Sequence, residues 1–161
     1  MRYQDQLIAL TEKAGNDLFR SARAVPPDKI TWQPLEQGRS ILNLVQECAY
    51  FPLFISQILS GERDFANETV EEERAKRYAA ELATGKTIEE CQAAYDKNVP
   101  ALLSAISNLT EEQLQTDLPL PFRPNKTHLL TELIWLPYWN MVYHLGQINY
   151  IQRLYGDHTM H

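Results

Sequence analysis

The sequence has few cysteines, and this scarcity excludes one class of protein. Its only two, Cys48 and Cys91, lie far apart and form no CxxC pair. A disulfide scaffold needs a much denser cysteine framework, so that class is excluded. We expect both residues to be reduced thiols in a cytoplasmic protein.

The sequence also has no cluster of basic residues, which nucleic-acid-binding and membrane-surface proteins usually have. The chain has 15 basic and 21 acidic residues, which gives a formal net charge of -6 and a pI near 5.2. Nucleic-acid binding leaves a basic footprint, and a membrane-surface helix needs a polar face rich in Lys and Arg. We therefore expect neither nucleic acid nor a membrane among the partners.

The sequence also has no long uninterrupted run of apolar residues. The first ten residues, MRYQDQLIAL, carry polar side chains where a signal peptide would have its apolar segment. The most apolar stretch, residues 41–59, is too polar for a transmembrane span. It is interrupted by Asn43, Gln46, Glu47, Pro52, Ser56 and Gln57. We expect neither a leader nor a membrane-spanning helix.

The sequence does have the composition of an ordinary globular protein. Of its 161 residues, 44% are apolar and 22% are charged, and both values are close to the averages for soluble domains. A chain of this length buries most of its apolar surface without help from disulfides or metals. We predict a single domain over residues 1–161.

Apolar residues recur at three- and four-residue steps through most of the chain, and this spacing predicts helices rather than strands. The predicted helices cover residues 2–24, 41–59, 69–83, 88–108 and 128–155, with one capped turn near 110–113. Thr127 is the expected N-cap of the last helix. The helix at 69–83 is rich in charge and is expected to be solvated. The four long helices predict an all-α four-helix bundle with a long connection between the second and third core helices.

Three polar residues interrupt or flank the apolar faces of the second and last long helices. Glu47 is the only charged residue between positions 41 and 59, and it lies next to the inward-facing Cys48. His144 falls in the apolar seam of the last helix, and Asn140 lies four residues before it on the same face. Polar groups in an apolar interior need partners, so we expect the three side chains to cluster.

Two interpretations fit a cluster of Glu47, Asn140 and His144. The first is a site for a divalent metal, Zn, Ni, Mn or Fe, because carboxylate oxygen and imidazole nitrogen suit these cations. Bundle cores often build such sites from facing helices. The second is a buried hydrogen-bond network that sets the register of the two helices. The residues alone leave both interpretations open.

Several short motifs resemble a known family over nearly the whole chain. The segments NMVYHLGQI at 140–148 and RLYGD at 153–157 resemble the last-helix signature of the DinB-like (DinB/YfiT) superfamily. Upstream, TWQP at 31–34, GRS at 38–40 and NLTEEQL at 108–114 are also similar to that family. His144 with the GQI that follows is the most telling of these pieces.

The resemblance implies a four-helix bundle, often dimeric, with a three-histidine metal site. In the family, one ligand comes from the second helix and two come from an HxxxH motif on the last. Some members use the metal to activate a low-molecular-weight thiol such as bacillithiol or mycothiol. By position these ligands fall on Glu47, Asn140 and His144, so this chain keeps one histidine of the three.

We therefore expect a DinB-like protein with a degenerate metal site, which holds a divalent cation weakly or not at all. Its function would be that of a non-catalytic binding bundle or a stress-associated one. The alternative is a divalent-metal-dependent hydrolase or low-molecular-weight thiol transferase. The expected partners are a second copy of the chain and a small-molecule ligand. Dimerisation follows from the family and from Trp135, Tyr138 and Trp139, which cannot all face inward on one helix.

Overall fold

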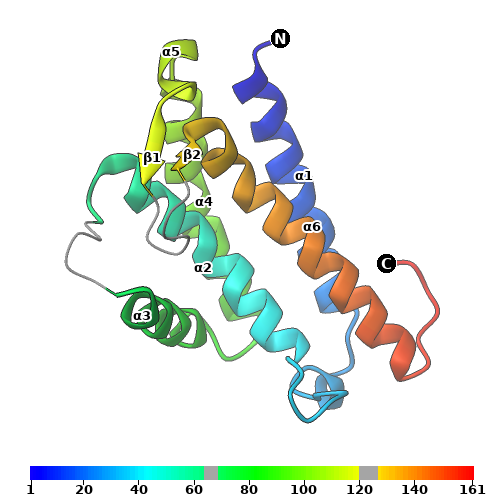
Figure 1. The fold of residues 1–161 in the computed structure, drawn as a ribbon. Helices are drawn as coiled ribbons and strands as arrows, with labels where there is room; N and C mark the ends of the chain where they lie inside the picture. The colour runs from blue at the N-terminus through cyan, green and yellow to red at the C-terminus, as the bar shows by residue number, and fades with distance from the viewer. Residues whose placement is uncertain (64–68, 120–126) are drawn as a thin grey trace.

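The computed structural model describes residues 1–63, 69–119 and 127–161 (Figure 1). Its elements are α1 (Tyr3–Arg23), the short 3-10 helix η1 (Pro27–Lys29), α2 (Ile41–Ser60), α3 (Val70–Ala83), α4 (Ile88–Asn108), α5 (Glu111–Leu114), β1 (Asp117–Pro119), β2 (Thr127–Leu129) and α6 (Leu130–Leu154). Within these described ranges, no helix combines the length and the hydropathy needed to cross a bilayer.

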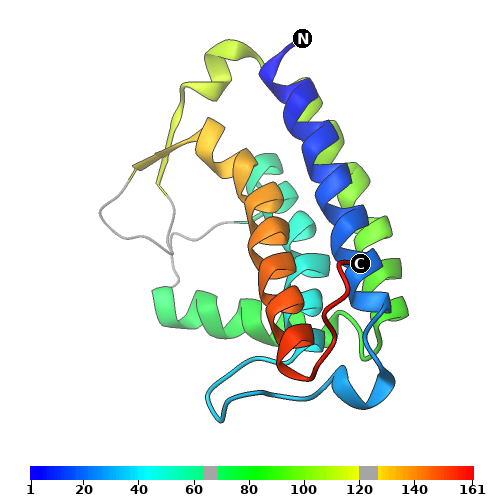
Figure 2. The ribbon, with the colours of Figure 1, turned by 90° about the vertical axis from the view of Figure 1, so that its right-hand side faces the viewer.

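Four long helices form the bundle. Helix α2 packs against α4 and α6, and α1 packs against the same two helices from the other side (Figures 1 and 2). Helix α3 lies outside the bundle in the connection between α2 and α4, and it packs against α2. The prediction of an all-α bundle with a long connection at this point is confirmed.

The helices begin where short polar side chains satisfy their first free amides. The hydroxyl of Ser40 accepts a hydrogen bond from the backbone amide of Asn43 at 3.2 Å. The same arrangement begins three further helices, with Thr69, Thr87 and Thr110 as N-caps. At the end of α2, Gly61 takes a φ of 72°, a left-handed conformation that glycine adopts at little cost. These local signals explain why the predicted bounds lie close to the observed ones.

The start of the last helix differs from the prediction. Thr127 is not its N-cap, because residues 127–129 form β2, which pairs with β1 in an antiparallel register of Asp117 with Leu129. Helix α6 begins at Leu130, whose amide donates to the carbonyl of Thr116 at 2.9 Å. The pairing strand lies ten residues upstream in sequence, so a local capping pattern could not reveal it.

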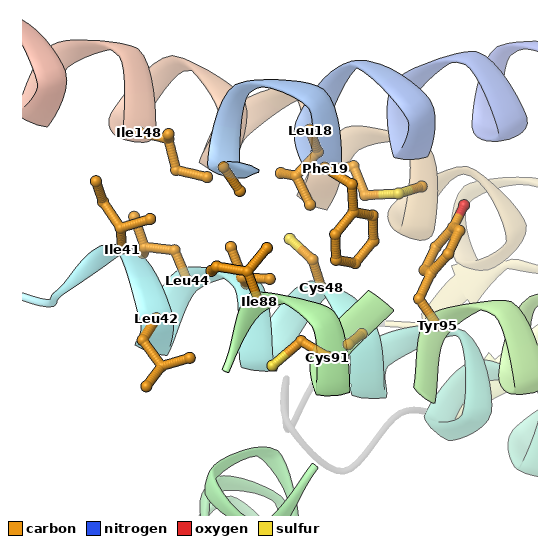
Figure 3. Close-up of a cluster of buried hydrophobic side chains, with 14 of the residues drawn as sticks. Leu18, Phe19, Ile41, Leu42, Leu44, Cys48, Ile88, Cys91, Tyr95 and Ile148 are labelled. Carbon is orange, nitrogen blue, oxygen red and sulfur yellow. The ribbon is translucent and has the colours of Figure 1, made fainter. Parts of the chain in front are cut away.

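The core between the helices is apolar and closely packed. Most of the predicted seam of α6 is buried, including Ile134, Met141, Ile148 and Ile151. Figure 3 shows the side chain of Cys48 inside one of the two apolar clusters. Burial, followed by the charge of the neighbouring carboxylate, raises the pKa of this thiol well above its usual value. Cys48 therefore acts as a small packing residue, not as a nucleophile.

Candidate functional site

The contact between α2 and α6 brings together the three polar residues singled out in the sequence. Asn140 Nδ2 donates a hydrogen bond to Glu47 Oε1 at 2.8 Å. His144 Nε2 lies 3.2 Å from the same oxygen. Asn140 and His144 are buried, and the side chain of Glu47 keeps 14% of its surface exposed. The three side chains therefore lie at the edge of the core, and Glu47 is the least buried of them.

A fourth residue completes this cluster, and sequence reasoning missed it. The guanidinium of Arg39 donates from Nη1 to Glu47 Oε2 and from Nη2 to the carbonyl oxygen of Asn43 at 2.7 Å. Arg39 lies in the loop before α2, eight residues from its carboxylate partner, so helix periodicity does not predict the contact. The contact could have been anticipated on chemical grounds, because a carboxylate on a buried helix face needs a positively charged partner. We call Arg39, Glu47, Asn140 and His144 the polar cluster.

Further contacts satisfy the remaining polar atoms of His144 and Asn140. Nδ1 of His144 lies 2.6 Å from Oε1 of Gln147, one turn further along α6. Oδ1 of Asn140 accepts from the thiol of Cys48 at 3.4 Å. Both carboxylate oxygens, both imidazole nitrogens and both amide atoms of the cluster thus have protein partners. Among the described residues, only Nε of Arg39 within this cluster is buried without a hydrogen-bond partner, so the cluster satisfies nearly all of its hydrogen bonds without a ligand.

The electrostatics of Glu47 follow from these partners. Burial alone would raise its pKa, but the hydrogen bond and charge of His144, followed by those of Arg39, outweigh burial and lower the pKa to about 2. Hydrogen bonds and opposite charges both favour the ionised form of a carboxyl. Glu47 is therefore a carboxylate at neutral pH, and its charge is balanced inside the protein.

A pocket of about 560 Å³ opens beside the polar cluster. Arg39 and Glu47 line one side of it. Helix α3 supplies the opposite side, with Glu71, Arg74, Arg77, Tyr78 and Glu81. The pocket thus lies between the bundle and the helix that packs outside it.

Most of α3 is exposed, as expected of a solvated helix, but two of its acidic residues, Glu73 and Glu81, are buried. Glu73 is fully buried between Arg63, at 3.7 Å, and Arg77, at 3.5 Å. Glu81 is 3% exposed and accepts from Arg77 Nη1 at 3.2 Å. The many charged residues of α3 predicted that its acidic side chains would be exposed. The arginines beside Glu73 and Glu81 instead allow these two side chains to be buried.

Glu81 has the opposite electrostatic behaviour to Glu47. Its burial, together with the charge of Glu47, raises its pKa to about 7, against the opposing effects of Arg77, Arg39 and His144. The sequence offered no signal for this residue, because an acidic side chain in a charged stretch is typical of a solvated helix face.

The donor set of the polar cluster fits a tightly held divalent metal poorly. Among residues 1–63, 69–119 and 127–161, no group of three or more His, Cys, Asp or Glu is placed to hold a cation. Asn140 turns its amide nitrogen, not its oxygen, toward Glu47, and Arg39 occupies the second carboxylate oxygen. A cation would have to displace these donors. Metal binding by Glu47, Asn140 and His144 stays a prediction.

Comparisons with known proteins place this fold in a family. A crystal structure of a DinB-like protein from Bacillus subtilis resembles the chain with a TM-score of 0.64 and 19% sequence identity. The similarity covers 96% of this chain and 94% of that one, and it concerns the fold. No curated protein matches the chain. The family model of the DinB superfamily matches residues 10–148, and the chain therefore belongs to the DinB superfamily.

Proposed function

We propose that this protein is a non-catalytic, ligand-binding member of its superfamily, in which an internal ion-pair network replaces the metal site. The observation that carries the proposal is the state of Glu47, whose two oxygens accept from Arg39, Asn140 and His144. In this arrangement the guanidinium supplies the positive charge that a cation would otherwise supply.

The chemistry of the polar cluster supports a structural role for it. A buried or half-buried charge destabilises a fold unless it is paired and hydrogen-bonded. Here the loop before α2 contributes Arg39, α2 contributes Glu47, and α6 contributes Asn140 and His144. Pairing across these elements sets the position of α6 along α2.

The adjacent pocket supports a binding role. Its volume of about 560 Å³ falls within the range of sites for small molecules, roughly 300–1,000 Å³. The carboxylate of Glu47 is shared between the network and the pocket wall. The network therefore gives the pocket a wall whose charges are held in place.

A metal titration tests this function. The experiment uses protein without an affinity tag and with His158→Ala and His161→Ala, so that the C-terminal histidines cannot bind metal. We expect no stoichiometric zinc or nickel by elemental analysis, and no change in Tm on addition of a chelator. As a matched control, Glu47→His with Asn140→His restores a three-histidine set and is expected to bind one equivalent of zinc.

The opposite result would support the catalytic alternative. One equivalent of metal in the protein with native Glu47 and Asn140, together with a lower Tm after chelation, would contradict the proposal. The function would then be that of a metal-dependent hydrolase or low-molecular-weight thiol transferase. In that case a cation that binds Oε2 of Glu47 must displace Arg39, which donates to that oxygen.

We also propose that the protein forms a homodimer through the outer face of α6. Trp135, Trp139 and Tyr143 form a row along the helix: the rings of Trp135 and Trp139 are tilted, with centroids 6.2 Å apart, and those of Trp139 and Tyr143 are stacked at 5.0 Å. Their exposed fractions are 39%, 42% and 50%, and such a row of exposed aromatic rings is typical of an interface. Light scattering after size exclusion should give twice the 18.6 kDa of one chain. Trp139→Glu should return the single-chain mass.

A further inference from the structure

The charged residues of the pocket divide into paired and unpaired groups. Arg39 is paired with Glu47, and Arg77 donates to Glu81 at 3.2 Å. Each of these two pairs joins one arginine of the pocket lining to one glutamate. Three arginines and three glutamates line the pocket in all, so the lining carries no net charge when all six are ionised.

One acid and one base remain without such a partner. The side chains of Glu71 and Arg74 both line the pocket and are both exposed. Within the part of the chain that the structure describes, neither side chain makes a hydrogen bond or an ion pair. They lie three residues apart on α3 and hence on the same helix face. The aromatic ring of Tyr78, one turn beyond Arg74, lines the pocket beside them.

We propose that this pocket binds a small organic zwitterion of the amino-acid or dipeptide kind. Its ammonium group pairs with Glu71, its carboxylate pairs with Arg74, and its carbon chain packs against Tyr78. This inference rests on the proposed binding function and names the ligand class of the same pocket.

The balance of charge favours a zwitterion over an ion of one sign. An organic anion would pair with Arg74 but leave Glu71 unpaired beside it, and an organic cation would leave Arg74 unpaired. Complementary charge at both ends lets both side chains gain a partner. The volume of about 560 Å³ accommodates an amino acid or a dipeptide with some water.

The pocket wall is formed before the ligand arrives. Glu73, on the buried face of α3, lies between the guanidinium groups of Arg63 and Arg77. Both guanidinium groups lie over the ring of Phe54 on α2, 4.9 and 5.8 Å from its centroid. These charge and aromatic contacts hold α3 against α2, and they fix the backbone from which the side chains of Glu71 and Arg74 extend. A preformed site loses less entropy on binding.

Calorimetry with a small ligand series tests the inference. The zwitterions are glycine, glycylglycine and 6-aminohexanoate, and the single-charge controls are hexylamine and hexanoate. Each is titrated to about 10 mM, which detects millimolar dissociation constants. We expect at least one zwitterion to bind at least about tenfold more tightly than either control, a difference that corresponds to one ion pair with a charged partner.

Charge-neutralising variants identify the site. Arg74→Gln and Glu71→Gln should each reduce zwitterion affinity to that of the controls. Arg153→Gln changes an exposed arginine of α6 outside the pocket lining and should leave the affinity unchanged. Circular dichroism of each variant confirms that the fold is retained, which is expected because both pocket residues are exposed.

The outcomes separate the ligand class from the binding function. If no zwitterion binds, or if a single-charge control binds equally well, the inference on ligand class is overturned. If zwitterion binding survives both variants, the assigned site is overturned. Neither result affects the metal titration, which tests the proposed function independently. A metal that binds stoichiometrically and stabilises the protein would overturn the proposed function, whether or not a zwitterion binds.

Discussion

Two buried carboxyl groups line the same pocket and behave in opposite ways. The pKa of Glu47 is lowered to about 2, whereas that of Glu81 is raised to about 7. Burial raises the pKa of both carboxyl groups. Glu47 accepts from Arg39, Asn140 and His144, whereas in the described part of the chain only Arg77 donates to Glu81.

The comparison indicates that the donors around each carboxyl decide whether the effect of burial on its pKa is outweighed, as at Glu47, or prevails, as at Glu81. Each donor that points at a carboxylate stabilises the ionised form. Glu81 lacks enough of them, and the charge of Glu47 adds to its cost of ionisation. One side of the pocket therefore carries a permanent charge, and the other carries a group that titrates near neutral pH.

The largest expected effect comes from removing a donor of Glu47. His144→Ala should lower the free energy of unfolding by about 3–5 kcal/mol, because it removes one of the three donors of Glu47 and opens a cavity in the core. Urea denaturation at pH 7 measures the change. His158→Ala, in the exposed C-terminal tail, is the control and should have no effect. A loss below about 1 kcal/mol would show that the polar cluster does not stabilise the α2–α6 contact.

The same pair can be examined by a double-mutant cycle of Glu47→Gln and His144→Ala. If the two side chains act as one network, the double variant should be less destabilised than the sum of the single variants. Additive losses would mean that each residue is held by other contacts.

The second largest expected effect comes from replacing Glu81, and here the free energy of unfolding should increase. Its folded-state pKa of about 7 lies above the ordinary value of 4.5 for a glutamate. Between pH 4.5 and pH 7 the native state therefore keeps a proton on Glu81 that the unfolded state has lost. Stability therefore falls as the pH rises from about 4.5 to about 7. Glu81→Gln removes this fall and should stabilise the protein at pH 8 by up to about 3 kcal/mol.

Denaturation at pH 5 and pH 8 measures this difference. The groups that face Glu81 are Arg77 on its own helix, Glu47 and Arg39 from the α2 side, and His144 from α6. Glu71→Gln, which neutralises an exposed acid on the same helix, is the matched control and should leave the pH dependence unchanged. An unchanged pH dependence in Glu81→Gln would show that this carboxyl ionises without penalty.

The smallest effect comes from Arg39. The Arg39 side chain is 36% exposed, so solvent screens its pair with Glu47, and Arg39→Gln should cost less than about 1 kcal/mol at pH 7. The stability that Glu47 contributes is present above pH 4.5 and is lost as the pH falls toward 2. Without Arg39 this loss should begin at higher pH. A carbon NMR titration of the Glu47 carboxyl in Arg39→Gln measures this shift. An unchanged pKa of Glu47 would show that Arg39 does not help to keep this carboxyl ionised.

The sequence anticipated one of these two carboxyl groups and not the other. Glu47, Asn140 and His144 could be predicted as a cluster because they interrupt or flank regular apolar seams, where a polar group needs a partner. Glu81 and Glu73 lie on a helix with no apolar seam to interrupt, so nothing in the pattern marks them as buried. Arg39 comes from a loop, whose path no periodicity describes.

The sequence by itself determined the helices, because caps, glycines and three- and four-residue apolar spacing act within a few residues of one another. It also determined that an acid, an amide and an imidazole would meet, since burial of polar groups in one core demands pairing. Only the tertiary structure decided that Arg39 neutralises Glu47, that α3 turns acids inward, and that β2 replaces the start of the last helix. Those outcomes depend on groups far apart in the chain, and the energy of a charge depends on which of them lies beside it.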